Sequence, residues 1–494
     1  MKVLALPNDI LYDVFLLITE YKQISDDGSK DWERCLTPWN LSATCKQWRT
    51  VCLNSPRLWT KLHFRNHRCI PTKGPARSRD TCGNSLGLLR YYLALDRAKD
   101  RSLIVNASVE GRAHECCASM LQILSFRRRN TWTALKLGTA VMFMVPWTRF
   151  SAQLATLETL DVDTYFHVNS QINPDSLDSQ FLNLPQAFAD LENIRAVRIG
   201  GLIGASPSLL EHLPWIQLQV VSLHRYTGTS ETIMLLLQLC HNLRSLHLHC
   251  TDHLSPPRDM TSFPLGSVIA PFLEALEIET ASVVASSSGP IMSILPSIST
   301  PKLTCMRINV RPDINLADEQ TIVGLLRRSS CHLTHLELEI AWCMFAPVTD
   351  FLLRELKDLR ACTLSYRIDW DRQQDRAALY DCADSFLEQL IAKDGSPIGL
   401  PRLERFKLRN LTFEPALLIQ IVESRLKKEG FTAISALDVE FARLEEVARL
   451  ALYRSILSER LAPAIRGGLQ ITFRSIATTR EGVSRHFSQL DDER

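Results

Sequence analysis

The sequence predicts an α+β protein in which a short all-helical module is followed by an irregular α/β solenoid. Three observations lead to this fold class: amphipathic stretches in the first sixty residues, an apolar pattern that recurs through most of the remaining chain, and helix-like segments between its copies. With 494 residues, 46% of them hydrophobic and 22% charged, the chain can bury a large core.

The N-terminal residues predict two amphipathic helices. In the first, Pro7 suits the helix start, and one face carries five apolar residues, Ile10, Leu11, Val14, Phe15 and Ile18. In the second, a stripe follows the helical spacing i, i+4, i+7 and i+11 and comprises Leu41, Cys45, Trp48 and Cys52. Short helices with bulky apolar edges therefore precede the repeats.

One pattern then returns along the chain: an apolar residue, two variable residues, a second apolar residue, one variable residue and a third apolar residue. Clear copies begin at Leu157, Ile194, Leu218, Leu243, Leu273, Leu303 and Leu333, weaker copies at Leu359, Leu403 and Ile434, and an earlier copy at Trp132. Most starts lie 25 to 34 residues apart, a period typical of a solenoid whose units bury their apolar edges against one another. Ordinary βα units of an open sheet are the alternative.

The segments between copies have the features of helices. In residues 415–430, Pro415 suits the first helical position, Lys427 and Lys428 suit the negative C-terminal end, and Gly430 can take the left-handed turn that stops the helix. Residues 318–328 likewise open with two acidic residues and close with two arginines. Alternating strands and helices at this period predict parallel strands stacked along one side of the solenoid.

The first sixty residues resemble an F-box. The matching pieces occur in the family's order and are Leu6-Pro7, Ile10-Leu11, Val14-Phe15, Cys45-Lys46-Gln47-Trp48-Arg49 and Leu58-Trp59. The connector at about residues 21–36 is longer than in most F-boxes, as in the fungal group of F-box-like proteins that carry degenerate leucine-rich repeats. The apolar pattern similarly resembles leucine-rich repeats over about residues 103–473, although the asparagine or cysteine expected after the last leucine is mostly missing.

This resemblance implies four segments and a function. The segments are an F-box-like docking module at residues 1–65 (with its insertion at about 21–36), a linker at 66–85, a leucine-rich-repeat-like solenoid at 86–476 and a flexible tail at 477–494. The implied function is that of a non-catalytic substrate-recognition subunit of a cullin–RING ubiquitin ligase, held through a Skp-type adaptor. The alternative is a repeat scaffold that keeps an F-box remnant without joining a ligase.

The resemblance also implies which residues bind the adaptor. The expected set is Leu6, Pro7, Ile10, Leu11, Val14, Phe15, Leu41, Cys45, Trp48, Leu58 and Trp59. Apolar anchors beside basic side chains are typical of interface hot spots. The plainer alternative is that Trp48 and Trp59 form the core of a small helical domain.

The repeats are expected to bind the substrate protein. Because strand side chains alternate, residues beside the second and third apolar positions of each copy should share one surface. The predicted substrate-binding face comprises His247, His249, Glu277, Glu279, Arg307, Glu337, Glu339, Lys407 and Arg409. Its mixed charge favours a protein partner with complementary alternating charge, while a solvated face without function is the alternative.

Composition and motifs argue against other function classes. A net charge of +2 gives no basic face for nucleic acid, and the uncharged stretch 281–301 is rich in serine and proline, so no membrane span is expected. Without an export signal, the cysteines should be reduced in a cytoplasmic or nuclear protein. Zinc could be held by His247, His249, Cys250 and His253, but they lack a recognised ligand spacing, so neither metal, cofactor nor catalytic site is expected.

Overall fold

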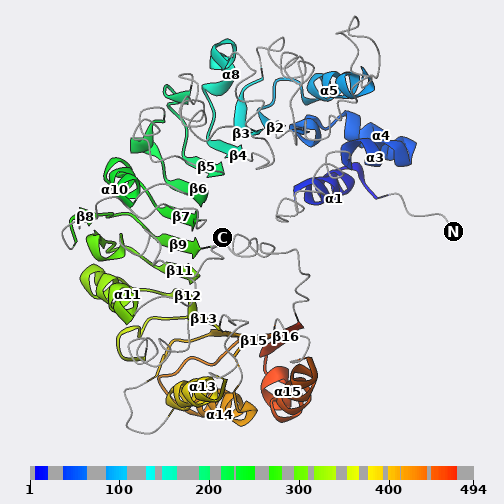
Figure 1. Cartoon of the computed structure of the whole chain (residues 1–494). Coiled ribbons are helices and arrows are strands. Elements are labelled where there is room, and N and C mark those ends of the chain that lie inside the picture. The colour runs from blue at the N-terminus through cyan, green and yellow to red at the C-terminus, as the bar shows by residue number, and fades with distance from the viewer. Residues whose placement is uncertain are drawn as a thin grey trace, which may run out of the picture. The chain divides into compact units, whose positions relative to one another are not determined.

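A computed structural model (Figure 1) describes residues 6–20, 37–63, 85–107, 130–138, 147–163, 188–200, 213–226, 230–250, 266–280, 294–309, 316–340, 353–366, 376–392, 399–411, 413–441 and 447–475. These residues form helices and parallel strands, so the predicted mixture of helix and strand is confirmed. The chain divides into two compact units, one reaching to Leu218 and the other running from Gln219 to Gly482. The insertion at 21–36, most of the linker (66–84) and the tail (477–494) lie outside the described residues.

The first unit joins a helical module to five parallel strands. The module comprises α1 (Asn8–Glu20), α3 (Thr37–Thr44), α4 (Lys46–Leu53) and the 3₁₀ turn η2 (Pro56–Trp59). Then follow β1 (Lys61–His63), α5 (Ser85–Ala98), β2 (Leu103–Ala107), β3 (Trp132–Gly138), η3 (Trp147–Phe150), α8 (Ser151–Leu154), β4 (Thr159–Asp163), β5 (Ala196–Gly200) and η6 (Trp215–Gln217). Each strand pairs in parallel with the next one along the chain.

The second unit repeats this arrangement over nine more strands. Its sheet contains β6 (Val220–Tyr226), β7 (Ser245–Cys250), β9 (Ala275–Thr280), β11 (Cys305–Asn309), β12 (His335–Ile340), β13 (Ala361–Tyr366), β14 (Arg405–Arg409), β15 (Ala436–Phe441) and β16 (Gln470–Ser475), in that spatial order. The helices are α10 (Ser230–Leu239), α11 (Leu316–Ser329), α13 (Arg376–Leu390), α14 (Pro415–Lys427), α15 (Val447–Arg460) and α16 (Ala462–Arg466). The turn η7 (Leu295–Ser297) precedes the small β10 (Ile298–Ser299), which pairs with β8 (Val268–Ile269). Figure 1 shows α10 and α11 on one side of the strands.

The recurring apolar pattern falls on the strands as predicted. Its second and third residues point into the core, as Leu246 and Leu248 do on β7, because successive strand residues face opposite ways. Its first residue closes the turn that leads into the strand: the N–H of Leu273 donates to the carbonyl of Ala270, and that of Leu303 to Thr300. Every predicted copy, from Trp132 to Ile434, leads into or lies on a strand of the structure.

Two predictions about the N-terminal module are corrected. The stripe from Leu41 to Cys52 is not one helix, because Cys45 is extended (φ −155°, ψ 171°) and separates α3 from α4. Its sulfur accepts a hydrogen bond from the backbone N–H of Trp48 at 3.5 Å and thereby caps α4. In addition, β1 lies within residues 1–65 but pairs with β2, so the sheet begins inside the predicted docking module.

Candidate functional site

The N-terminal module has an aromatic core. Phe15 of α1 meets the ring of Trp48 edge-on, with 5.0 Å between ring centroids. Trp59 packs edge-on against Trp39 at 4.9 Å, and its indole N–H donates to the carbonyl of Cys52 at 2.8 Å. Burial raises the pKa of the Cys52 thiol to about 11, so this cysteine behaves as a small core residue.

Four of the residues predicted to bind the adaptor are therefore core residues. Leu11, Phe15, Leu58 and Trp59 are only 1–4% exposed, so they cannot touch a partner while the module stays folded. The prediction placed Ile10, Leu11, Val14 and Phe15 of α1 together on the adaptor-binding surface. It is corrected because α3 and α4 cover only one side of that helix and bury Leu11 and Phe15 there.

The other side of α1 remains uncovered and forms what we call the α1 stripe: Leu6, Ile10, Val14, Leu17 and Ile18. These side chains are 37–62% exposed, and Pro7 beside them is exposed as well. The spacing i, i+4, i+7 and i+8 from Ile10 to Ile18 keeps four of them on one face of α1, and Leu6 lies two residues before the helix begins at Asn8. Leu17 was missed in the sequence, although its spacing of seven residues from Ile10 could have revealed it.

The remaining predicted adaptor-binding residues lie at the junction of α3 and α4. Cys45 is exposed, whereas Leu41 and Trp48 are half-buried. The side-chain amide of Gln47 on α4 donates to the carbonyl of Leu6 at 2.8 Å and to Oδ1 of Asn8 at 3.2 Å. These two bonds fix the start of α1 and thus the position at which the α1 stripe begins.

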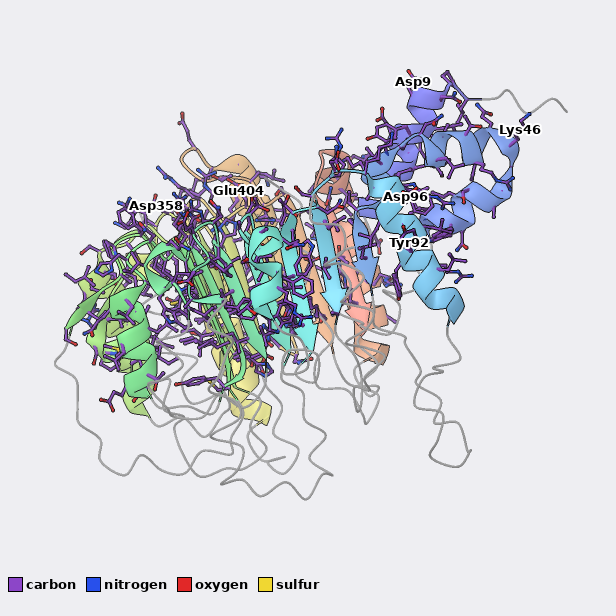
Figure 2. The ribbon with its side chains drawn as sticks, turned by 90° about the horizontal axis from the view of Figure 1, so that it is seen from above. Asp9, Lys46, Tyr92, Asp96, Asp358 and Glu404 are labelled. Carbon is purple, nitrogen blue, oxygen red and sulfur yellow. The ribbon has the colours of Figure 1, made fainter. Side chains whose placement is uncertain are left out.

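A cation–π contact fastens this module to α5. The guanidinium carbon of Arg97 lies 4.4 Å from the ring centroids of both Trp39 and Trp59. Burial lowers the pKa of Arg97, while Asp96 and Cys52 act in the opposite direction. Figure 2 labels Asp9 and Lys46 on the module and Tyr92 and Asp96 on α5. Together with the β1–β2 pairing, this contact joins the helices to the first strands of their unit.

The second unit carries the predicted substrate-binding face on its strands. His247, Glu277, Arg307 and Glu337 are consecutive register partners on β7, β9, β11 and β12. His249, Glu279, Asn309 and Glu339 form the next row, and Lys407 and Arg409 on β14 continue the two rows across β13. The predicted adjacency of these residues is confirmed. We call the whole non-core side of β7–β16 the outward face.

An ion-pair ladder runs along the outward face. Nδ1 of His247 lies 2.5 Å from Oε2 of Glu277, and the guanidinium of Arg307 donates to Glu277 at 2.9 Å and to Glu337 at 2.8 Å. The ladder continues from Glu337 to Arg409 at 3.5 Å and from Arg409 to Glu440 at 3.3 Å. It ends with Lys407, whose Nζ lies 2.7 Å from the carboxylate of Glu440.

The ladder shifts the ionisation of its buried carboxyl groups. Burial alone would raise the pKa of Glu277, but the hydrogen bond from His247 and the charge of Arg307 outweigh it and lower that pKa to about 2. Burial also opposes ionisation of Glu440, whose pKa is nevertheless lowered by Arg409 and Lys407. Both carboxylates are therefore ionised at neutral pH and stabilised by partners within the chain.

Small side chains on β13 allow long side chains from its neighbours to meet above it. Arg409 on β14 reaches Glu337 on β12 across Ser365, and Arg405 reaches Nε2 of His335 at 2.9 Å across Ala361. Ser365 is buried beneath these bridges. The outward side of β13 is thus a neutral strip between charged strands.

The zinc site considered for the histidine cluster does not fit the geometry of β7. His247 and His249 lie on the outward face, whereas Cys250 points into the core, where burial raises the pKa of its thiol. His253 lies outside the described residues. Over the part of the chain that the structure describes, no group of three or more histidine, cysteine, aspartate or glutamate side chains is arranged to hold a metal ion.

Within the described ranges, no helix has both the length and the apolar character that a membrane crossing requires. No protein-family model matches the sequence, and neither does any curated protein.

Proposed function

We propose that this chain is an F-box protein with an irregular leucine-rich-repeat solenoid and that it acts as the substrate-recognition subunit of a cullin–RING ubiquitin ligase. The single observation that carries the proposal is the α1 stripe. Its exposed residues Leu6, Ile10 and Val14 belong to the F-box-like motif pieces Leu6-Pro7, Ile10-Leu11 and Val14-Phe15. The partner on this stripe would be a Skp-type adaptor.

The physical argument concerns apolar surface in water. Four large exposed apolar side chains on one face of α1, with exposed Leu6 just before the helix, are more than the scattered surface hydrophobes of an ordinary protein. Covering each of them with a partner stabilises the complex by roughly 1–2 kcal/mol, since about half of each side chain is already shielded. Gln47 holds the start of the helix in place, which lowers the conformational entropy lost on binding.

The repeats would supply the second half of the function. Parallel in-register strands that each follow the same apolar pattern support a leucine-rich-repeat solenoid. The outward face of the second unit would hold the target protein, and the chain would contribute proximity between target and ubiquitin-loading enzyme without chemistry of its own. Free cysteines such as Cys240 and Cys362 fit a protein that acts in the cytoplasm or nucleus.

The test is adaptor binding by a double variant of the α1 stripe. Ile10→Glu with Val14→Glu places two charges on exposed positions, so it should weaken binding of a recombinant Skp-type adaptor at least about 100-fold while leaving the melting temperature unchanged. Leu452→Glu on α15 is the control, since Leu452 is also an exposed apolar helix residue but lies in the other unit. Undiminished binding by the double variant would overturn the assignment of the stripe.

Wild-type protein that fails to bind the adaptor would instead favour the alternative, a repeat scaffold with an F-box remnant. Replacing tryptophans would not separate these outcomes. Because Trp59 is core and contacts both Trp39 and Arg97, its removal would loosen the module and abolish binding indirectly.

A further inference from the structure

The outward face of the second unit separates its charges into two halves. On β9, β11 and β12 the outward face carries four carboxylates and one guanidinium: Glu277, Glu279, Glu337, Glu339 and Arg307. His335 on β12 is left out of this count. On β14, β15 and β16 there are four cations and two carboxylates: Arg405, Lys407, Arg409, Arg474, Asp438 and Glu440. An acidic half and a basic half therefore lie side by side in one sheet.

The strand between the halves is neutral. Ala361, Thr363 and Ser365 are the outward residues of β13, and the bridges from Arg405 and Arg409 cross it. The bridge from Arg409 to Glu337 pairs one charge of each half, so two negative charges remain in excess on the acidic half and one positive charge on the basic half. Single strands still alternate in sign, with Arg307 on β11 and Asp438 and Glu440 on β15. Summed over each half, however, the charges are opposite in sign.

We infer that the outward face binds a protein segment whose charges are segregated in the complementary order, with basic side chains over β9–β12 and acidic side chains over β14–β16. The inference rests on the proposed function and specifies its substrate class. Charge complementarity is the reason: a uniformly basic segment would be attracted to one half and repelled by the other, and so would a uniformly acidic one. A segment with both blocks meets a net opposite charge on each half, even though Arg307 on β11 and the two carboxylates of β15 have the same sign as the block above them.

Strand spacing sets the separation of the two blocks. Neighbouring strands lie about 4.8 Å apart, so β11 and β14, the middle of the acidic half and the start of the basic half, are roughly 14 Å apart across β12 and β13. An extended peptide spans this distance in about four residues. The blocks of a matching segment therefore follow one another closely along its chain.

Two synthetic peptides of identical composition test the inference with the full chain. One carries three lysines, a Gly-Ser spacer and three glutamates, and the other alternates the same lysines and glutamates. Fluorescence anisotropy at low ionic strength should give at least about fivefold tighter binding of the segregated peptide, with the difference lost in high salt. Equal affinity for both peptides would overturn the inference.

Variants locate the binding on the face. Glu279→Gln with Glu339→Gln neutralises two register positions of the acidic half without changing side-chain size, and we expect at least threefold weaker binding of the segregated peptide. Glu355→Gln is the matched control, because that carboxylate is exposed but pairs with Arg327 of a helix instead of lying on the outward face. Melting temperatures close to wild type for all variants exclude unfolding as the cause, and unchanged binding by the double variant would refute the location.

We expect peptide binding on the outward face to be independent of adaptor binding on the α1 stripe. The Ile10→Glu, Val14→Glu variant should bind the segregated peptide as the wild type does. Loss of adaptor binding with retained peptide preference supports both proposals, whereas peptide binding without preference defeats only the substrate class.

Discussion

Arg307 occupies the centre of the ion-pair ladder, and its replacement by methionine tests whether the ladder stabilises the sheet. Methionine keeps most of the aliphatic volume but removes the guanidinium that bonds to Glu277 at 2.9 Å and to Glu337 at 2.8 Å. Removing one partner of a buried pair typically costs 3–5 kcal/mol, because the remaining charge stays desolvated. Since about a fifth of these side chains is exposed, we expect a loss of about 2–3 kcal/mol in the stability of β9–β12.

The pKa of Glu277 provides an independent measure of how much His247 and Arg307 stabilise its carboxylate in the folded state. Its decrease from 4.5 to about 2 corresponds to roughly 3 kcal/mol, which His247 and Arg307 supply together. Because the folded-state pKa lies below the unfolded value, this stabilisation is complete above about pH 4.5 and is lost as the pH falls towards 2. The difference between wild type and Arg307→Met should therefore shrink at about pH 3.

Hydrogen exchange measured by mass spectrometry reports the effect where it is expected, in the backbone amides of β9, β11 and β12. Arg327→Met is the matched control, because Arg327 is exposed and its contact with Glu355 is 3.8 Å long, so its loss should cost less than about 0.5 kcal/mol. Equal protection of these three strands in wild type and Arg307→Met at pH 7 would refute the reasoning. So would a difference that persists undiminished at low pH.

Three further predictions concern the side chains of Trp59, Arg97 and Arg425. Trp59→Ala should destabilise the N-terminal module by about 3–5 kcal/mol, measured as faster exchange in α3 and α4, whereas Leu53→Ala at an exposed position should have little effect. Arg97→Met should cost about 1–2 kcal/mol, because the cation–π contact with Trp39 and Trp59 is lost, and hydrogen exchange in η2 and α5 should become faster. Unchanged exchange there would contradict a stabilising role for this contact. Arg425→Met should be neutral or stabilising. Burial lowers the pKa of Arg425 to about 10, its Nη1 donates to the carbonyl of Leu400 at 2.9 Å and its guanidinium lies 5.2 Å from the ring of Phe431, but among the described residues its Nε and Nη2 have no hydrogen-bond partner. A loss above about 2 kcal/mol in urea unfolding would instead mean that the contacts with Leu400 and Phe431 outweigh the desolvation of the charge.

Local patterns predicted much of the fold. The apolar pattern located strands from β3 to β15 because its alternation and the residue before each strand are properties of consecutive residues. Helix α14 begins at Pro415, as expected, and Gly430 does adopt a positive φ of 86° beyond its end. The short β1 was missed, since three residues give no periodicity to recognise.

The candidate docking surface could be predicted only in part. Both faces of α1 carry large apolar residues, so the sequence identified Ile10 and Phe15 alike as contact residues. The break at Cys45 likewise had no signal in a stripe whose helical spacing was intact. Which face is core was decided by the packing of α3 and α4 against α1.

The amino-acid sequence by itself determined where strands form and which of their residues face away from the core, because these properties depend on neighbours along the chain. The tertiary structure decided which apolar residues of the module stay exposed and which charges of the outward face are paired. Both depend on residues about thirty or more positions apart, such as Phe15 with Trp48 and Glu277 with Arg307, that only packing and strand register bring together.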